Sequence, residues 1–224
     1  SLTVGALDNS QGQISGKADV QAKVAALNNQ GGQLMAAQRL ELVADSLDNR
    51  QGGLVGATQG LALKIGAVDN RGGELSSKAD VSLDGTRLAN SEGGKVLAEG
   101  ALELTVAQVI NRSQGLLSGK AGLTLSGDSM DNHGGALLNE QQLKAELLGL
   151  LDNRQGLISA EGRLGLKSAE LDNSGGSVSS AGALTLEHGG ALLNQGGVIV
   201  TDGALLLNSA RLDNRNQGNI SAKA

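Results

Sequence analysis

The fold of this chain is decided by the stretch Leu47-Asp48-Asn49-Arg50-Gln51-Gly52-Gly53-Leu54, the clearest copy of a motif that recurs throughout the sequence. Its asparagine returns at positions 9, 29, 49, 70, 90, 111, 132, 153, 173, 194 and 214, so every interval is 20 or 21 residues. A self-similar period of this length is the sequence signature of a solenoid, in which each repeat is one structural unit stacked on the last.

Each repeat has three apolar stations. The first is a glycine, any residue and then an aliphatic residue; its eleven copies are Gly12-Ile14, Gly32-Leu34, Gly52-Leu54, Gly73-Leu75, Gly94-Val96, Gly115-Leu117, Gly135-Leu137, Gly156-Ile158, Gly176-Val178, Gly197-Ile199 and Gly218-Ile220. The second is an alternating pair, as in Leu102-Glu103-Leu104, and the third is the aliphatic residue two places before the asparagine. Alternation with period two predicts strands that are buried on one face.

Three short strands per repeat, separated by corners of Gly, Asn and Ser, predict a triangular coil of backbone. Adjacent coils must then pair in parallel, and parallel crossovers are right-handed by strong preference. The sequence therefore predicts an all-β fold, a right-handed parallel β-helix (β-solenoid) of ten to eleven coils of 20–21 residues. A leucine-rich repeat fits less well, because its Asn follows the second Leu by three positions whereas Leu42 precedes Asn49 by seven.

Composition supports a narrow and uniform interior. The chain has no Phe, Trp, Tyr, Pro or Cys, and it has 35 Gly. A globular core of this size normally uses aromatic side chains, which bury the most area per residue. We expect Met35 and Met130 to fill the interior beside Leu, Val, Ile and Ala. No shift in composition divides the chain, so we expect residues 1–224 to form a single β-helix domain, excerpted from a longer array.

The corners of the coil account for the Asn and Gly residues that recur in each repeat. Asn tolerates positive φ and can bond its own backbone, and stacked Asn amides can form a hydrogen-bonded ladder along the rod. After Asn111 and Asn214 the glycine comes one residue late, which predicts a one-residue bulge at those two corners. Residues 139–148 have helical propensity, but the flanking Asn132 and Asn153 keep the register, so we expect this segment to stay in the coil.

Charge and hydropathy exclude several classes of partner. The net charge of −5 is distributed along the chain, and there are no runs of basic residues. The sequence therefore shows no binding site for nucleic acid or for an anionic membrane surface. No stretch approaches 18 consecutive apolar residues, so we expect no membrane insertion of this segment.

A column of Asp precedes the Asn column, at positions 8, 48, 69, 131, 152, 172 and 213. Stacked carboxylates are ligands for calcium, but the Gly-Gly-x-Gly-x-Asp motif of calcium-binding β-rolls is absent. We favour a turn-forming corner in which the Arg that follows the Asn at positions 50, 71, 112, 154 and 215 relieves the repulsion between carboxylates.

No catalytic, cofactor-binding or metal site is expected. His133 and His188 lack a second ligand at metal-binding spacing, so we expect both at the surface. Glu99 and Glu103 are expected to be outward strand residues and not a buried catalytic pair. Polysaccharide-cleaving β-helices need projecting loops, and uniform coils leave no room for them; the chain is therefore not expected to be an enzyme.

The repeat resembles that of the filamentous haemagglutinin family. The copies that carry the resemblance best are Leu151-Asp152-Asn153-Arg154-Gln155-Gly156-Leu157-Ile158-Ser159-Ala160 and Leu171-Asp172-Asn173-Ser174-Gly175-Gly176-Ser177-Val178-Ser179-Ser180. The resemblance covers essentially the whole chain. It implies an adhesin or a contact-dependent growth-inhibition effector, secreted or held at the surface of a Gram-negative bacterium. Such exoproteins leave the cell by two-partner secretion, through an outer-membrane transporter.

Two functions remain open from the sequence. The segment is either a structural stalk that projects an adhesive or toxin-delivery module, or a direct adhesin whose exposed faces bind a receptor or glycan on a host or target cell. The residues that would make such contacts are Lys17, Lys78, Lys120 and Arg39. The lack of aromatic residues weighs against sugar binding, so the stalk is favoured.

Overall fold

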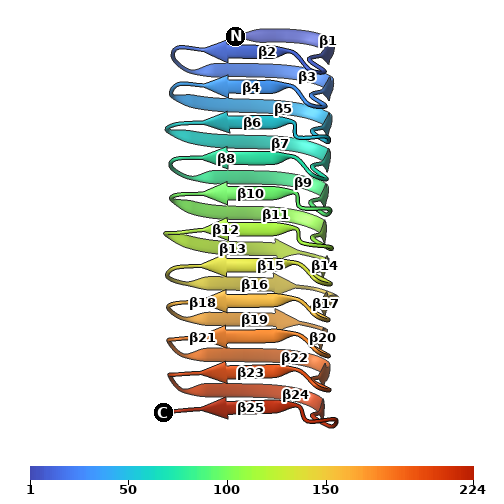
Figure 1. Cartoon of the computed structure of the whole chain (residues 1–224), viewed down its shortest axis with the longest axis vertical. Helices are drawn as coiled ribbons and strands as arrows, with labels where there is room; N and C mark the ends of the chain where they lie inside the picture. The colour runs from blue at the N-terminus through green and yellow to red at the C-terminus, as the bar shows by residue number, and fades with distance from the viewer.

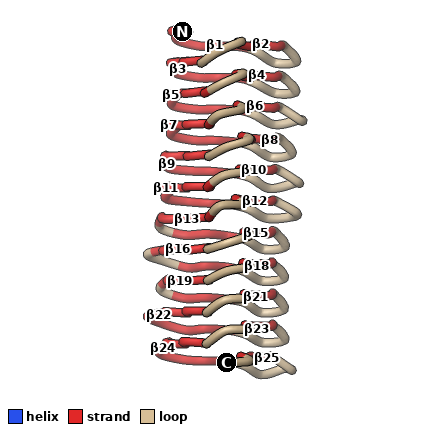
Figure 2. Tube along the Cα trace, turned by 90° about the vertical axis from the view of Figure 1, so that its left-hand side faces the viewer, coloured by secondary structure: helices blue, strands red, loops and turns tan.

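The computed structural model describes residues 1–224, which form 25 β-strands and no helix. The strands lie in two sheets that run the length of a rod, with the N- and C-termini at opposite ends (Figures 1 and 2). Every strand pair is parallel, and paired residues lie one repeat apart, as in Leu40 opposite Leu61. The predicted stack of coils is confirmed.

Sheet B has eleven strands of four residues, one per coil: β2 (Gln13–Gly16), β4 (Gln33–Ala36), β6 (Leu54–Ala57), β8 (Glu74–Ser77), β10 (Lys95–Ala98), β12 (Leu116–Gly119), β15 (Ala136–Asn139), β18 (Leu157–Ala160), β21 (Ser177–Ser180), β23 (Val198–Thr201) and β25 (Asn219–Ala222). Their second and fourth residues point into the rod, and their first and third point outward.

Sheet A has fourteen strands. Eight are long: β1 (Leu2–Asp8), β3 (Val20–Asn28), β5 (Arg39–Asp48), β7 (Gly60–Asp69), β9 (Val81–Ala89), β11 (Ala101–Ile110), β22 (Leu184–Leu193) and β24 (Leu205–Asp213). In three coils the long strand is split into β13 (Gly122–Gly127) and β14 (Ser129–Asp131), β16 (Leu143–Leu147) and β17 (Leu150–Asp152), and β19 (Leu164–Ser168) and β20 (Glu170–Asp172). The segment of residues 139–148 thus contains a strand, as expected.

The long strands bend around one edge of the rod (Figure 1). In β5 the inward residues alternate as far as Ala44, then Asp45 and Ser46 are both exposed, and Leu47 is inward again. The two exposed residues reset the alternation, so one strand covers two faces. The expectation of three separate strands per coil therefore holds only where the long strand is split.

The interior is one continuous cluster of 44 buried residues that includes Leu104 and Met130. Two placements expected from the sequence are wrong. Met35 lies on the outer face of sheet B, with its sulfur across Gly56, because it falls between the inward residues Leu34 and Ala36. The residue opposite Leu34 in the next coil is Val55, and Leu54 is partly exposed, so the first station of that repeat is Gly53-Val55.

The corner asparagines do not adopt positive φ, contrary to expectation. The left-handed residue is the second one after each Asn, for example Gln11 (φ 52°) or Gly31 (φ 60°). Four corners have an extra residue, and there the third residue after the Asn is left-handed too. These are the corners of Asn111 and Asn214, as predicted, and also those of Asn49 and Asn90, which the sequence reading missed.

Candidate functional site

A ladder of asparagine amides runs the length of the rod. The side-chain Nδ2 of each corner Asn from Asn9 to Asn194 donates to the Oδ1 of the next corner Asn at 2.7–2.8 Å, in ten consecutive bonds. From Asn29 to Asn194 these side chains are fully buried. The ladder predicted from the spacing is confirmed.

The ladder also ties the amides to the backbone. The Nδ2 of Asn49 lies 2.9 Å from the carbonyl oxygen of Gly53 in its own coil and 3.1 Å from that of Glu74 in the next. A buried amide left unpaired costs about 1–3 kcal/mol, and here each is paired. The ladder therefore has a structural role and presents no free polar group to a ligand.

The glycine that follows each corner makes room for the ladder. A Cβ built on Gly135 would lie 1.8 Å from the carbonyl oxygen of Asn111 in the preceding coil, and one on Gly73 would lie 1.9 Å from that of Asn49. No side chain fits there. These glycines are required for close approach between coils.

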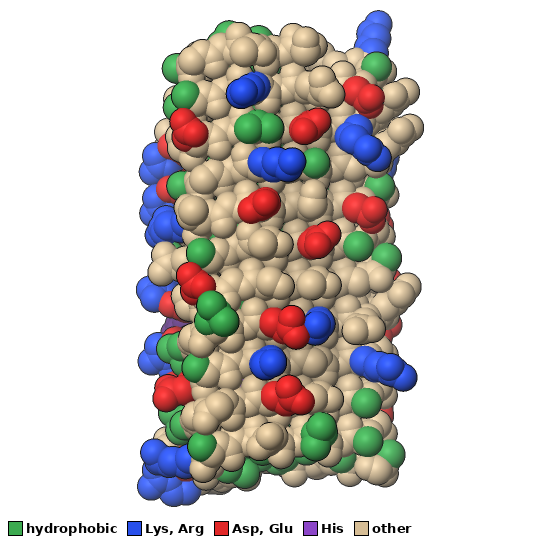
Figure 3. Space-filling model, turned by 180° about the vertical axis from the view of Figure 1, so that it is seen from behind, with side chains coloured by type: hydrophobic (Ala, Val, Ile, Leu, Met, Phe, Trp, Pro, Cys, Tyr) green, Lys and Arg blue, Asp and Glu red, His purple; other side chains and the backbone are tan.

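The Asp column forms an edge of ion pairs beside the ladder. The Oδ1 of Asp48 accepts from the backbone N–H of Arg50, and the Arg50 guanidinium lies 2.7 Å from Asp48 and 3.7 Å from Asp69 in the next coil. The side-chain hydrogen bond from Arg50 lowers the pKa of Asp48. Acidic and basic side chains follow one edge of the rod in Figure 3, at the left of that view.

The same arrangement recurs at Asp69–Arg71, Asp152–Arg154 and Asp213–Arg215, and Arg112 pairs with Asp131 of the next coil. The preference for turn-forming carboxylates neutralised by Arg is therefore confirmed. No group of three or more His, Cys, Asp or Glu lies in a geometry that could hold a metal ion. The structure also contains no helix with the length and apolar character needed to cross a membrane.

The expectation of a surface position is wrong for His188, while His133 is partly exposed. His188 is 4% exposed, because it continues the inward alternation of Leu184 and Leu186 in β22. Its Nδ1 lies 2.8 Å from the Ser168 hydroxyl, which donates in turn to the carbonyl of Glu170. Its Nε2 is buried without a partner, and burial lowers the pKa of His188 to about 4.

The basic residues proposed for direct contacts do not come together. Lys17, Lys78 and Lys120 are exposed at the corner that follows sheet B, but they belong to three different coils that are not neighbours. Lys120 pairs with Glu99. Glu103 is exposed on the outer face of sheet A, and the residues opposite it in the two neighbouring coils are Ser82 and Thr124. Neither a basic cluster nor a carboxylate pair results.

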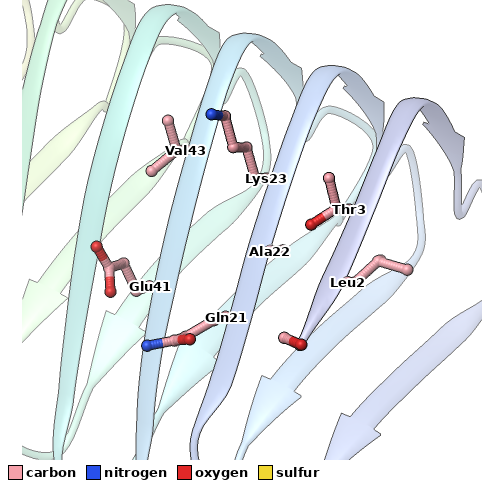
Figure 4. Close-up of a pocket in the computed structure, with 8 residues that line it drawn as sticks. Leu2, Thr3, Gln21, Ala22, Lys23, Glu41 and Val43 are labelled. Carbon is pink, nitrogen blue, oxygen red and sulfur yellow. The ribbon is translucent and has the colours of Figure 1, made fainter.

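The hollows of the surface are shallow. The one drawn in Figure 4 has a volume of about 220 Å³ and lies at the N-terminal end of sheet A. Thr3, Lys23 and Val43 project from the outer side of β1, β3 and β5, beside Gln21 and Glu41. A single Lys and a single Glu on an open face supply no catalytic pairing.

A comparison with protein-family models identifies the repeat. The model of the haemagglutinin repeat matches residues 1–44, 36–105, 97–155, 148–196 and 180–224, which together cover the chain from end to end. The comparisons with curated proteins and with solved structures gave no match.

Proposed function

The chain belongs to the haemagglutinin repeat family, and from this premise we propose that it is a structural stalk within a filamentous adhesin-type exoprotein. The stalk holds an adhesive or toxin-delivery module at a fixed distance from the cell. We assign it no enzymatic role, because the family's β-solenoid is a structural and adhesive fold.

The observation that carries this proposal is the unbroken amide ladder from Asn9 to Asn214. Every coil has the same 20 or 21 residues and no inserted loop. Since neighbouring coils are fixed by backbone pairing, by the ladder and by the Asp–Arg edge, the rod resists bending and shortening. Residues 1–224 act in this proposal as one β-helix domain.

The proposal extends to the route of export. Family membership places the chain among secreted or cell-surface exoproteins in a two-partner secretion context. We propose that the segment crosses the outer membrane of a Gram-negative bacterium unfolded, through its partner transporter. Without any Cys, no disulfide can lock the chain before it crosses. Coils can then fold one upon another, since each contacts only its neighbours.

The experiment that tests the stalk changes its length in the parent exoprotein. Removing or adding whole coils should change the reach of the distal module by about 4.8 Å per coil, without changing the affinity of that module for its target. Loss of target affinity in a shortened variant that is correctly folded and displayed would overturn the stalk.

The direct-adhesin alternative is tested separately, by immobilising this segment on an array of glycans and cell-surface proteins. The stalk predicts no saturable binding. Saturable binding that Lys17→Glu or Lys78→Glu reduces would favour the adhesin, because both residues are exposed. Thermal melts that match the unaltered segment would show that these variants remain folded.

A further inference from the structure

The outer face of sheet B is almost free of charge. Among the first and third residues of its eleven strands, only Glu74 and Lys95 are charged, and these two are neighbours on β8 and β10. The apolar side chains on the face include Met35, Leu54, Leu97, Leu116, Leu138 and Leu157. The outer face of sheet A differs, since it carries charged residues such as Lys23, Glu41 and Lys64.

The outer face of sheet B therefore mixes apolar side chains with uncharged polar ones such as Ser76 and Ser118, and no other part of the chain packs against it. In α/β proteins, parallel sheets that are apolar on both faces are covered on both. The outward side chains of sheet B are mostly half-buried by their neighbours in the same column, so the face is flat, with Glu74 and Lys95 as its only charged side chains. A contiguous surface of this type marks an interaction site.

We propose that the outer face of sheet B docks against the same face of a second copy of this chain, with the two rods antiparallel. A two-fold axis along the strand direction, between β8 and β10, generates this arrangement. Each side of the interface is then the same patch, as an isologous dimer requires. Because the patch is nearly uncharged, two copies of a chain with net charge −5 meet on the face where repulsion is smallest.

Charge complementarity selects the antiparallel arrangement. The axis places Glu74 of one copy opposite Lys95 of the other, twice. It also places β6 opposite β12 and β4 opposite β15, so that Leu54 faces Leu116 and Met35 faces Leu138 of the second copy. If the rods were parallel, each Glu74 would lie level with Glu74 of the other copy, and no opposite charge would face it. The sheet order supports these pairings.

The size of the face sets the expected strength. Eight coils overlap, at about 4.8 Å each, and the four-residue strands are about 13 Å long, so each copy buries about 500 Å². A total of about 1,000 Å² is the lower limit for a specific interface. We therefore expect a weak dimer in exchange with the monomer, strengthened in proportion to the number of coils that overlap.

Sedimentation equilibrium over a concentration series reaching the millimolar range tests the dimer and its geometry. Glu74→Lys and Lys95→Glu should each raise the dimer dissociation constant about tenfold, since each creates two like-charge contacts. The double swap Glu74→Lys with Lys95→Glu should restore it. Glu103→Lys, on the outer face of sheet A, is the matched control and should have no effect. A swap that fails to restore dimerisation would overturn the antiparallel geometry.

A second variant tests the face without relying on the ion pairs. Leu116→Asp places a charge opposite Leu54 of the second copy and should abolish the dimer, whereas Leu206→Asp, at a residue 56% exposed on sheet A, should leave it intact. Circular dichroism confirms that each variant is folded. An unaltered chain that stays monomeric at every concentration would overturn the proposal, as would a dimer that responds to Leu206→Asp and not to Leu116→Asp.

Discussion

At the scale of single residues, the ladder asparagines join neighbouring coils through several hydrogen bonds each. The Nδ2 of Asn111 lies within hydrogen-bond distance of Asn132 Oδ1 at 2.8 Å, the Gly115 carbonyl at 3.0 Å and the Ala136 carbonyl at 3.1 Å, and its Oδ1 accepts from Asn90. One side chain thus joins three coils. No hydrophobic residue of similar size can replace these bonds.

We predict that Asn111→Ala lowers the free energy of unfolding by about 2–4 kcal/mol, because it leaves buried polar groups of the neighbouring coils unpaired. Urea denaturation followed by circular dichroism measures the change. Asn208, which is exposed on β24, provides the matched control, and Asn208→Ala should change stability by less than about 0.5 kcal/mol. Equal effects at the two positions would show that the ladder adds no stability.

His188 gives the rod a dependence on pH. The Ser168 hydroxyl donates to Glu170, so the Nδ1–H of His188 must donate to that hydroxyl, and a second proton on Nε2 would be buried with no acceptor. The folded pKa of about 4 lies below the ordinary value of 6.5. The unfolded chain therefore binds more protons between pH 6.5 and pH 4, and stability is lost as the pH falls through that window.

We predict that the unaltered chain loses about 3 kcal/mol of stability through His188 between pH 7 and pH 4, and that His188→Leu removes this loss. Ser168 keeps its bond to Glu170 in that variant. Denaturation curves at several pH values measure the difference. The pKa values of Asp48 and Asp69 are lowered, so these carboxylates lose their contribution to stability only below about pH 4. The effect of His188 on stability can therefore be measured separately, above that pH. If the free energy of unfolding fell equally with pH in the unaltered chain and in His188→Leu, the assignment of a buried neutral histidine would be wrong.

At the scale of the structural element, the glycines are of two kinds, one at the corners and one within the strands. Gly135 has the carbonyl oxygen of Asn111 in the place where a Cβ would lie, while Gly165, on the outer side of β19, has no atom within 4 Å of that position. Neither has a positive φ. The two sites therefore differ in the space around the residue and not in backbone conformation.

We predict that Gly135→Ala destabilises the chain by more than 2 kcal/mol, since the backbone of two coils must separate. Gly165→Ala should be neutral or stabilising by up to about 1 kcal/mol, because Ala restricts the unfolded chain more than Gly does. Thermal and urea unfolding of the two variants compare them directly. If Gly165→Ala proved the more damaging of the two, the assignment of the close contact would be wrong.

The sequence predicted the coil and the ladder because both follow from the repeat period, which depends on no single residue. It failed where the position within a coil had to be known to one residue. Val55 replaces Leu54 as the inward residue because that corner has an extra left-handed residue, Gly52. The burial of His188 could have been predicted from its spacing after Leu184 and Leu186, and the outward position of Met35 from its place between Leu34 and Ala36.

At the scale of the whole molecule, stability is distributed among like interfaces. Each coil contacts only its neighbours, so the free energy of unfolding is approximately a sum of coil and interface contributions. The apolar cluster, the ladder and the parallel register repeat with the same period. A change that preserves the period should consequently preserve the fold, and a change that breaks it should disrupt the fold locally.

We predict that deleting residues 112–153, two complete repeats, yields a folded rod in which Asn111 precedes Arg154 and the corner pattern Asn-Arg-Gln-Gly is retained. The rod should be about 10 Å shorter by small-angle X-ray scattering, with a parallel-sheet circular dichroism spectrum and only modestly lower stability. Deleting residues 133–142, about half a coil, removes β15 and leaves β12 and β18 without a common neighbour. That variant should lose cooperative unfolding, since sheet B is interrupted while sheet A is not. If both deletions were tolerated equally, the coil would not be the unit of folding, and the rod's stiffness would need another origin.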